Sequence, residues 1–199
     1  AKDLIVRVEA LDVATGNECT FSCAECKYAY RDSIFKKEWK HQFIVTYVTY
    51  CLQKNPEYRL EYGNVRNELE KRGEGVTLDN VRKVIISIRE AKLPDPKVQG
   101  NAGSFFMNPI IPRKQYEDLL ALYPDLPHYD VDEAHVKVPA AWMIDRCGWK
   151  GKQMGRAGVH DKQALVLVNC GGATGQEVIA LSKAIQGSVK EKFGIEIFP

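Results

Sequence analysis

Apolar and polar residues alternate along the start of the chain, with the two-residue period of a strand that buries one face. The alternation covers residues 5–13, and after a turn at Gly16 it continues over residues 18–22, which predicts a β-hairpin. Residues 43–52 are rich in β-branched and aromatic side chains and predict a further strand. Three strands alone make a poor domain, so we expect them to form the edge of a larger sheet.

The hydrophobic period changes to that of a helix from residue 78 onward. Thr77 is a suitable N-cap, apolar residues recur at helical spacing over 78–91, and Pro94 and Pro96 end the pattern. The same kind of evidence predicts, in chain order, a strand at 104–111, helices at 115–122 and 139–147 (with Pro139 at the first helical position), a strand at 164–169, a helix at 175–193 that stops at Gly194, and a strand at 195–198. The predicted fold class is α+β, with a strand-rich segment at 1–61 followed by a small α+β domain at 62–199.

The composition is that of an ordinary soluble globular protein, because 45% of its 199 residues are hydrophobic and 27% are charged. A net charge of +2 gives no electrostatic reason to expect a nucleic acid or a membrane surface as a partner. No apolar run is long enough to span a bilayer, and no signal peptide opens the sequence. We therefore expect a cytoplasmic protein.

The sequence contains six cysteines, of which Cys23 and Cys26 form a CxxC pair with Cys19 four residues before it. This spacing suggests a zinc site. A second pair at a suitable spacing is missing, however, and the four histidines are scattered along the sequence. We therefore expect reduced thiols and no bound metal.

The segment GNAGSFFMNP at residues 100–109 carries the strongest candidate chemistry. Ser104 directly follows a glycine, the residue that tolerates positive φ and the close approach of another group. The two aromatic residues after Ser104 indicate a buried strand behind it. The segment predicts a hydroxyl that faces a ligand from the end of a strand, although an ordinary strand start with a capping serine fits the same residues.

Five segments together resemble the UDP-N-acetylenolpyruvoylglucosamine reductase (MurB) family. They are YRDSIFK at 30–36, KLPDPKV at 92–98, GNAGSFFMNP at 100–109, PAAWMIDRCGWKG at 139–151 and GVHDKQALVLVN at 158–169. Each segment alone is weak evidence, but all of them in this order, over nearly the whole sequence, are highly specific. The resemblance implies a flavoenzyme of peptidoglycan precursor synthesis that reduces UDP-N-acetylglucosamine enolpyruvate to UDP-N-acetylmuramate with FAD and NADPH.

The resemblance also implies a division of the chain and an incomplete active site. Residues 1–61 correspond to the C-terminal part of the FAD-binding domain and residues 62–199 to the substrate-binding domain. The Gly- and Asn-rich loops that cradle the FAD pyrophosphate in this family have no match here, and the family's catalytic glutamate would follow Pro199. We therefore expect a fragment that has no reductase activity and holds no FAD by itself. Its oligomeric state does not follow from the sequence.

In the family's reaction a serine protonates the inner carbon of the enol ether, and an arginine binds the adjacent carboxylate. Ser104 and Arg31 match these two positions. A serine hydroxyl is a poor acid in water, but an enolate carbon is a strong base, so the transfer is feasible once the geometry is fixed. The planar guanidinium suits a carboxylate because it donates two parallel hydrogen bonds. A surface salt bridge from Arg31 to Asp32 or Glu25 is the alternative role.

The resemblance implies further residues around the UDP-sugar. They are Lys92 at a phosphate, the diphosphate-lining residues Asn108, Tyr129 and Gln163, Tyr62 on a mobile loop over the nucleotide, and Lys137 near the uridine. Each of these residues also has an alternative, purely structural role that involves no ligand. The helix dipole favours a lysine at the position of Lys92, Gln163 suits a cap of the next strand, and Tyr62 and Tyr129 suit ring packing.

One position departs from the family's pattern, because Met107 stands where relatives often have a lysine. The change removes a positive charge that would attract the diphosphate if that lysine faces it. A non-catalytic UDP-sugar-binding module that uses Lys92, Asn108 and Gln163 is a second class of function that fits the sequence. In such a module Arg31 and Ser104 would have no evident purpose.

Overall fold

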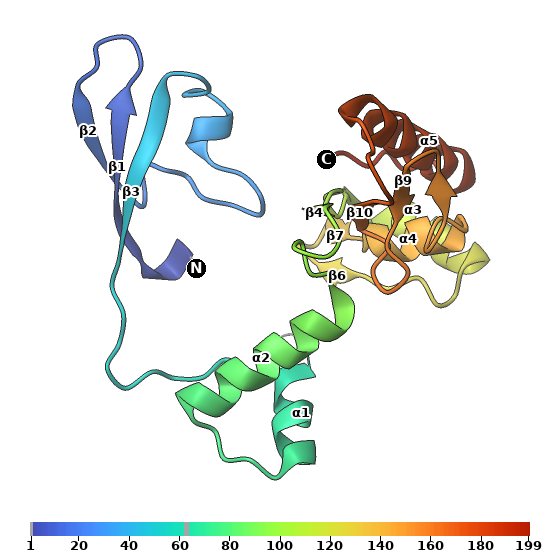
Figure 1. Cartoon of the computed structure of the whole chain (residues 1–199), viewed down its shortest axis with the longest axis horizontal. Helices are drawn as coiled ribbons and strands as arrows, with labels where there is room; N and C mark the ends of the chain where they lie inside the picture. Colours follow the sequence, from blue (N-terminus) through green and yellow to red (C-terminus); the bar gives the residue numbers. More distant parts are fainter. Residues whose placement is uncertain (1, 62–63) are drawn as a thin grey trace. The chain divides into compact units, whose positions relative to one another are not determined.

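The computed structural model describes residues 2–61 and 64–199 (Figure 1). The chain divides into two compact units, Ala1–Arg59 and Leu60–Pro199, and each unit is described by itself. The boundary expected from the sequence, between residues 61 and 62, lies two residues beyond this division. Tyr62 falls outside the described residues.

The first unit is an antiparallel sheet of three strands in the order β2-β1-β3. The strands are β1 (Ile5–Asp12), β2 (Glu18–Ser22) and β3 (Phe43–Tyr50), and short 3-10 helices cover Lys2–Leu4 and Ile34–Lys36. Gly16, at φ 72°, lies in the turn between β1 and β2, where glycine adopts the left-handed conformation without strain. Val8 and Ala10 of β1 are buried. The predicted hairpin and third strand are confirmed, with strand ends one or two residues shorter than expected.

The second unit combines five helices with two antiparallel sheets in its described part, which confirms the α+β class. The helices are α1 (Val65–Arg72), α2 (Leu78–Lys92), α3 (Arg113–Leu122), α4 (Ala140–Arg146) and α5 (Gly175–Phe193). One sheet has the order β4-β10-β9-β8, with β4 (Asn101–Ser104), β8 (Gln153–Met154), β9 (Ala157–Val159) and β10 (Val166–Asn169). The other has the order β5-β7-β6, with β5 (Ile110–Pro112), β6 (Tyr129–Asp130) and β7 (His135–Lys137).

Helix α5 supplies much of the core of this unit. Its buried apolar residues recur every four positions, the spacing that places side chains on one face of a helix. They are Leu181, Ile185, Val189 and Phe193. They share one hydrophobic cluster with buried side chains of β9 and β10, so this face of α5 packs toward the sheet that carries β4.

Helices α2 and α5 begin where the sequence predicts and end within one residue of the prediction, because their caps are local. The Thr77 hydroxyl accepts a hydrogen bond from Asn80 N at 3.2 Å at the start of α2. Thr174 and Glu177 form a capping box at the start of α5, and Gly194 ends that helix in the left-handed conformation at φ 65°. Each of these interactions links residues within one turn of the chain, so the sequence pattern alone can specify them.

Several short elements differ from the sequence-based expectation. The strand predicted at 104–111 is interrupted between β4 and β5, because Phe105 N donates to Leu165 O at 2.8 Å whereas Met107 N donates to Phe198 O at 2.7 Å. These two partners lie in different segments, so no continuous ladder forms. The segment at 195–198 was predicted as a strand, and this is wrong, since it contains no strand in the structure.

The remaining corrections concern boundaries and elements that the pattern did not reveal. Helix α3 begins two residues earlier than predicted, directly after Pro112. Helix α4 is shorter by one residue at each end, and Pro139 is its N-cap instead of its first helical residue. Helix α1 and strands β6 to β9 were not predicted, because they are short and their pairing partners are set by the tertiary structure.

The capping carboxylate of α5 gives a pH-dependent prediction. Glu177 accepts hydrogen bonds from Arg156 Nε at 3.1 Å and from Thr174 N at 2.9 Å, and these donors lower its pKa from 4.5 to about 2. A lowered folded-state pKa stabilises the fold above the unfolded value, and this contribution is lost as the pH falls from about 4.5 toward 2. We expect the urea midpoint of Glu177→Gln to depend less on pH than that of the wild type across this range. Parallel pH profiles of the two proteins would contradict the assignment.

Candidate active site

Ser104 is the last residue of β4 and is exposed. It lies opposite Val166 in the β4–β10 pair, and the following residue, Phe105, continues to bond to Leu165 O. Gly103 adopts φ 62°, a conformation that a side chain would strain, and its N–H donates to Asn101 Oδ1 at 3.0 Å. Phe106, two residues after Ser104, is fully buried. The serine is thus presented at the end of a strand with a buried aromatic anchor directly behind it.

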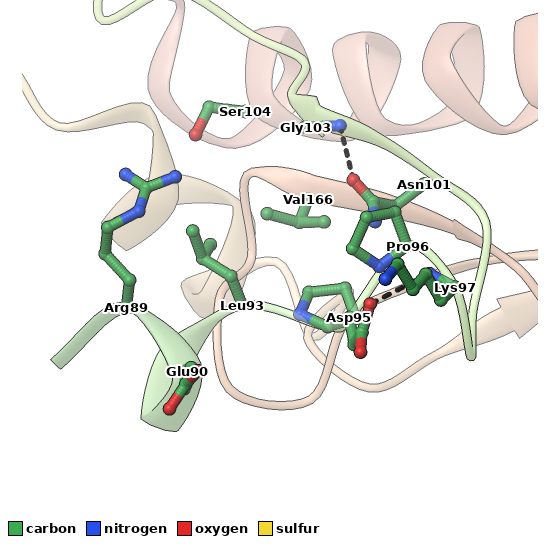
Figure 2. A pocket seen from close by; sticks show the side chains of 11 residues that line it. Arg89, Glu90, Leu93, Asp95, Pro96, Lys97, Asn101, Gly103, Ser104 and Val166 are labelled. Atoms are coloured by element: carbon green, nitrogen blue, oxygen red, sulfur yellow. Dashed lines mark hydrogen bonds between the residues drawn. The ribbon is translucent and has the colours of Figure 1, made fainter. Parts of the chain in front are cut away.

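A cavity of about 630 Å³ lies beside this serine (Figure 2). Asn101, Gly103, Ser104 and Val166 line one part of it, and the end of α2 with the turn at 93–97 lines the rest. The turn is held by Asp95, whose Oδ1 accepts from Lys97 N at 2.9 Å. This arrangement brings the KLPDPKV segment and the serine segment together around one volume, as expected for a ligand-binding cleft.

Both signs of charge line the cavity. Arg89 and Lys97 contribute positive charge, whereas Glu90 and Asp95 contribute negative charge. Figure 2 shows the Arg89 guanidinium extending toward the side of the cavity where Ser104 lies, while the Glu90 carboxylate points away from it. The part of the cavity near the serine hydroxyl is therefore the part that suits an anion.

Lys92, the phosphate-binding candidate from the sequence, is the exposed last residue of α2 and does not line this cavity. Arg89 precedes it by three positions, and residues so spaced are neighbours on a helix surface. Arg89 was not predicted from the sequence, although its helical spacing from Lys92 was the signal that could have identified it. Lys97 was not predicted either, because its place at the cavity depends on the path of the turn.

Asn108 and Gln163 do not line the cavity, and their side-chain oxygens bond to backbone N–H groups. Asn108 Oδ1 accepts from Ala140 N at 2.9 Å, at the start of α4. Gln163 Oε1 accepts from Leu165 N at 3.4 Å, just before β10. The second contact corresponds to the capping role that the sequence analysis considered as an alternative for Gln163.

Tyr129 and Lys137 lie opposite each other in the pair of β6 and β7. The Lys137 Nζ atom is 5.5 Å from the centroid of the Tyr129 ring, within the range of a cation–π interaction. Tyr129 keeps 59% of its surface exposed, so packing against other side chains covers less than half of this residue. The two residues form a polar and aromatic face on the small sheet.

Arg31 belongs to the first unit, where it lies in a tight loop. Its φ is 52°, Ala29 and Asp32 exchange backbone hydrogen bonds around it, and Lys36 Nζ donates to Arg31 O at 2.8 Å. Asp32 forms an ion pair with Lys37, and the hydrogen bond from Lys37 lowers the pKa of Asp32. Arg31 thus occupies a strained backbone conformation in a well-bonded loop, as residues at functional sites often do.

The other carboxylate that the sequence analysis considered as a partner of Arg31 is engaged locally. Glu25 Oε2 accepts from Ser22 Oγ at 2.7 Å and from Ser22 N at 2.8 Å, and these bonds lower the pKa of Glu25.

The residues of the first unit do not fit a flavin pyrophosphate site. Such sites use glycine-rich loops whose backbone N–H groups approach the phosphates closely. Residues 1–59 contain one glycine, Gly16, which lies in the hairpin turn between β1 and β2. These residues therefore supply no backbone cradle for a flavin pyrophosphate.

The cysteines and the other possible metal ligands show no further site chemistry in the described residues. All six cysteines are free thiols, and burial raises the pKa of the Cys26 thiol. In the part of the chain that the structure describes, no three histidine, cysteine or acidic side chains gather as a metal site would require. Among the helices described there, none is both long enough and apolar enough to cross a bilayer.

Comparison with known proteins identifies relatives over the whole chain. The family model of the C-terminal domain of UDP-N-acetylenolpyruvoylglucosamine reductase matches residues 95–199. The curated reductase of that name from Bacteroides fragilis is 61% identical over 198 residues, which are 100% of this chain and 59% of the relative. The one from Burkholderia cenocepacia is 49% identical over 191 residues, covering 94% of this chain and 55% of the relative.

A solved structure shares the fold. The crystal structure of UDP-N-acetylenolpyruvylglucosamine reductase from Thermus caldophilus superimposes with a TM-score of 0.58 at 21% sequence identity. The match covers 100% of this chain and 54% of that structure. The chain thus spans between half and two thirds of the length of the relatives named here.

Proposed function

The chain belongs to the UDP-N-acetylenolpyruvoylglucosamine reductase family, and on this premise we propose that it serves the reduction of UDP-N-acetylglucosamine enolpyruvate to UDP-N-acetylmuramate. The intact enzyme would use NADPH and FAD, in the cytoplasm, as a step of peptidoglycan precursor synthesis. The observation that carries the proposal is the position of the exposed residue Ser104 at the end of β4, beside a cavity that Arg89 also lines.

Ser104 acts in this proposal as the proton donor. The flavin of the intact enzyme would supply the hydride for the outer vinyl carbon. Negative charge then develops on the inner carbon, and the Ser104 O–H bond breaks as its proton passes to that carbon. The resulting serine oxygen recovers a proton from water. A hydroxyl on a strand end, held by the β4–β10 pair, supplies the fixed geometry that such a transfer needs.

Arg31 and the basic residues near the cavity bind the anionic groups. Arg31 is proposed to hold the substrate carboxylate through two parallel hydrogen bonds. Arg89, Lys97 and Lys92 provide positive charge near the serine segment for the carboxylate or the diphosphate. Asn108, Tyr129, Gln163 and Lys137, together with Tyr62, remain proposed contacts to the rest of the UDP-sugar.

The test of the function is the reaction itself. We expect the intact enzyme to consume NADPH over repeated turnovers only when FAD and UDP-N-acetylglucosamine enolpyruvate are both present. We expect the 199-residue chain alone, with FAD added, to consume none, because its first unit lacks a glycine-rich cradle for the cofactor. Turnover by the 199 residues would contradict this second expectation. Binding of UDP by an intact protein without reductase activity would instead support the non-catalytic UDP-sugar-binding module.

The basic residues give a kinetic prediction for the intact enzyme. Removing a charged hydrogen-bond donor at a phosphate is expected to raise KM about 10-fold or more, with a smaller fall in kcat. We expect this for Lys92→Ala and for Arg89→Ala, and Arg89 should show the larger effect because it lines the cavity. Lys83→Ala is the matched control, since Lys83 forms an exposed pair with Asp79 on the same helix. An unchanged KM for Lys92→Ala would remove Lys92 from the phosphate site.

A further inference from the structure

The strand that presents Ser104 contains a β-bulge. In the pairing of β4 with β10, Ser104 lies opposite Val166. Asn101 lies opposite Val168, and the register shifts between these two pairs. The step from residue 101 to 104 in β4 thus corresponds to the shorter step from 166 to 168 in β10, so β4 holds one extra residue. Bulges often occur beside active sites, where they change the direction of a side chain.

The bulge decides which side of the sheet Ser104 faces. Side chains alternate between the two faces of a regular strand, so residues three positions apart would point to opposite faces. The extra residue returns Asn101 and Ser104 to one face, because both lie opposite valines of β10 that are two positions apart. Asn101, Ser104 and Val166 all line the cavity. Leu167, which lies between the two valines in the sequence, belongs instead to the main hydrophobic cluster. The bulge therefore allows Ser104 to share the cavity side with Asn101.

The side chain of Asn101 stabilises the bulge. A bulge leaves backbone groups of the extra residue without a partner in the ladder. Asn101 Oδ1 accepts from Gly103 N at 3.0 Å, as Figure 2 shows, and the bond spans two residues in the manner of an Asx turn. Asn101 Nδ2 donates to Gln99 O at 3.3 Å. All four residues of β4 are exposed, so their conformation depends on hydrogen bonds more than on the packing of their side chains.

We propose that Asn101 is a positioning residue for Ser104. Its amide oxygen holds Gly103 at φ 62°, and the bulge so formed directs the next residue, Ser104, toward the reacting carbon. Asn101 acts in this proposal through the backbone and makes no bond to the substrate. The inference deepens the proposed function and rests on it. A proton donor that is displaced by about 1 Å can lose about 10²-fold in rate, so the bond from Gly103 N matters for catalysis.

The test uses the intact enzyme and follows the oxidation of its reduced flavin by UDP-N-acetylglucosamine enolpyruvate in a stopped-flow instrument. We expect Asn101→Ala to lower the limiting rate at saturating substrate about 10- to 100-fold. The substrate concentration that gives half of this rate should stay within about 2-fold of the wild type, because no contact to the substrate is lost. The reduction of the flavin by NADPH should keep its wild-type rate.

A conservative variant and a matched control accompany this substitution. Asn101→Ser keeps a neutral acceptor that can bond to the N–H two residues on, although more weakly, so its limiting rate should lie between those of Asn101→Ala and the wild type. Asn169→Ala is the control, because Asn169 forms a similar turn at the end of β10 and does not line the cavity. Its Oδ1 accepts from Gly171 N at 2.9 Å and from Ala173 N at 3.0 Å. We expect Asn169→Ala to react at the wild-type rate.

Several results would overturn the inference and leave the proposed function intact. One is a wild-type limiting rate in Asn101→Ala, since the backbone pairing of β4 would then suffice to place Ser104. Another is a raised half-saturating concentration in Asn101→Ala, which would mean that Asn101 contacts the substrate directly. A rate in Asn101→Ser no higher than in Asn101→Ala, or an equally slow Asn169→Ala, would also overturn it. A wild-type enzyme whose reduced flavin is not oxidised by the substrate would overturn the proposed function itself.

Discussion

Ser104→Ala in the intact enzyme is expected to abolish substrate reduction, with kcat lower by about 10²–10⁴. The substitution removes one oxygen atom from an exposed residue at the end of β4, so the fold and the β4–β10 pairing should be unaffected. The enzyme loses the proton donor for the inner carbon of the enol ether. NADPH should therefore still reduce the bound flavin at the wild-type rate. Stopped-flow absorbance of the flavin measures the two half-reactions separately.

Ser188→Ala is the matched control for this experiment. The Ser188 hydroxyl donates to Ala184 O at 2.9 Å within α5, and Ser188 does not line the cavity. We expect its turnover to match the wild type. A normal turnover number for Ser104→Ala would refute the role as proton donor. Loss of both half-reactions in Ser104→Ala would indicate damage to the cofactor site instead.

Phe106→Ala is expected to give the largest loss of stability, about 3–5 kcal/mol in the free energy of unfolding. Phe106 is among the largest fully buried side chains and belongs to the main core of the second unit. It also packs edge-on against Phe105, with ring centroids 5.1 Å apart. Truncation leaves a cavity that the surrounding β-sheet and α5 can fill only in part. Urea unfolding, followed by tryptophan fluorescence, measures the effect.

The unfolding experiment is best done in a Trp39→Phe background. Trp142 and Trp149 lie in the second unit and Trp39 in the first, so fluorescence then reports on the second unit alone. Phe105→Ala is the control, because Phe105 is only partly buried and should cost clearly less. A loss below about 1 kcal/mol for Phe106→Ala would show that the segment after Ser104 is not anchored in the core.

Elements with local start and stop signals were predictable from the sequence. Helices α2 and α5 occupy the expected ranges because Thr77, the Thr174–Glu177 box and Gly194 act within one turn of the chain. The hairpin of β1 and β2 was predictable for the same reason, since its alternating residues flank a turn at Gly16. In each case the residues that form the interaction are close together in the sequence.

Elements that depend on distant partners were not predictable in this way. The segment after Ser104 was expected to continue as a strand, but Phe105 N pairs with Leu165 O and Met107 N with Phe198 O. Strands β6 to β9 have two or three residues each, too few for a period to be visible in the sequence. Their existence depends on which backbone edge packs beside them.

The candidate site likewise has features that the sequence specifies and features that depend on the tertiary structure. The sequence by itself determined the motif, the serine and the family resemblance, because these depend on residue identity and order. Only the tertiary structure decided that Arg89 and Lys97 line the cavity of Ser104 whereas Lys92 does not. It also decided which backbone group Asn108 bonds to, since the N–H that donates to its Oδ1 belongs to Ala140, 32 residues away. Hydrogen bonds and cavities depend on which residues are close together in space. The order of residues along the chain does not reveal which distant residues these are.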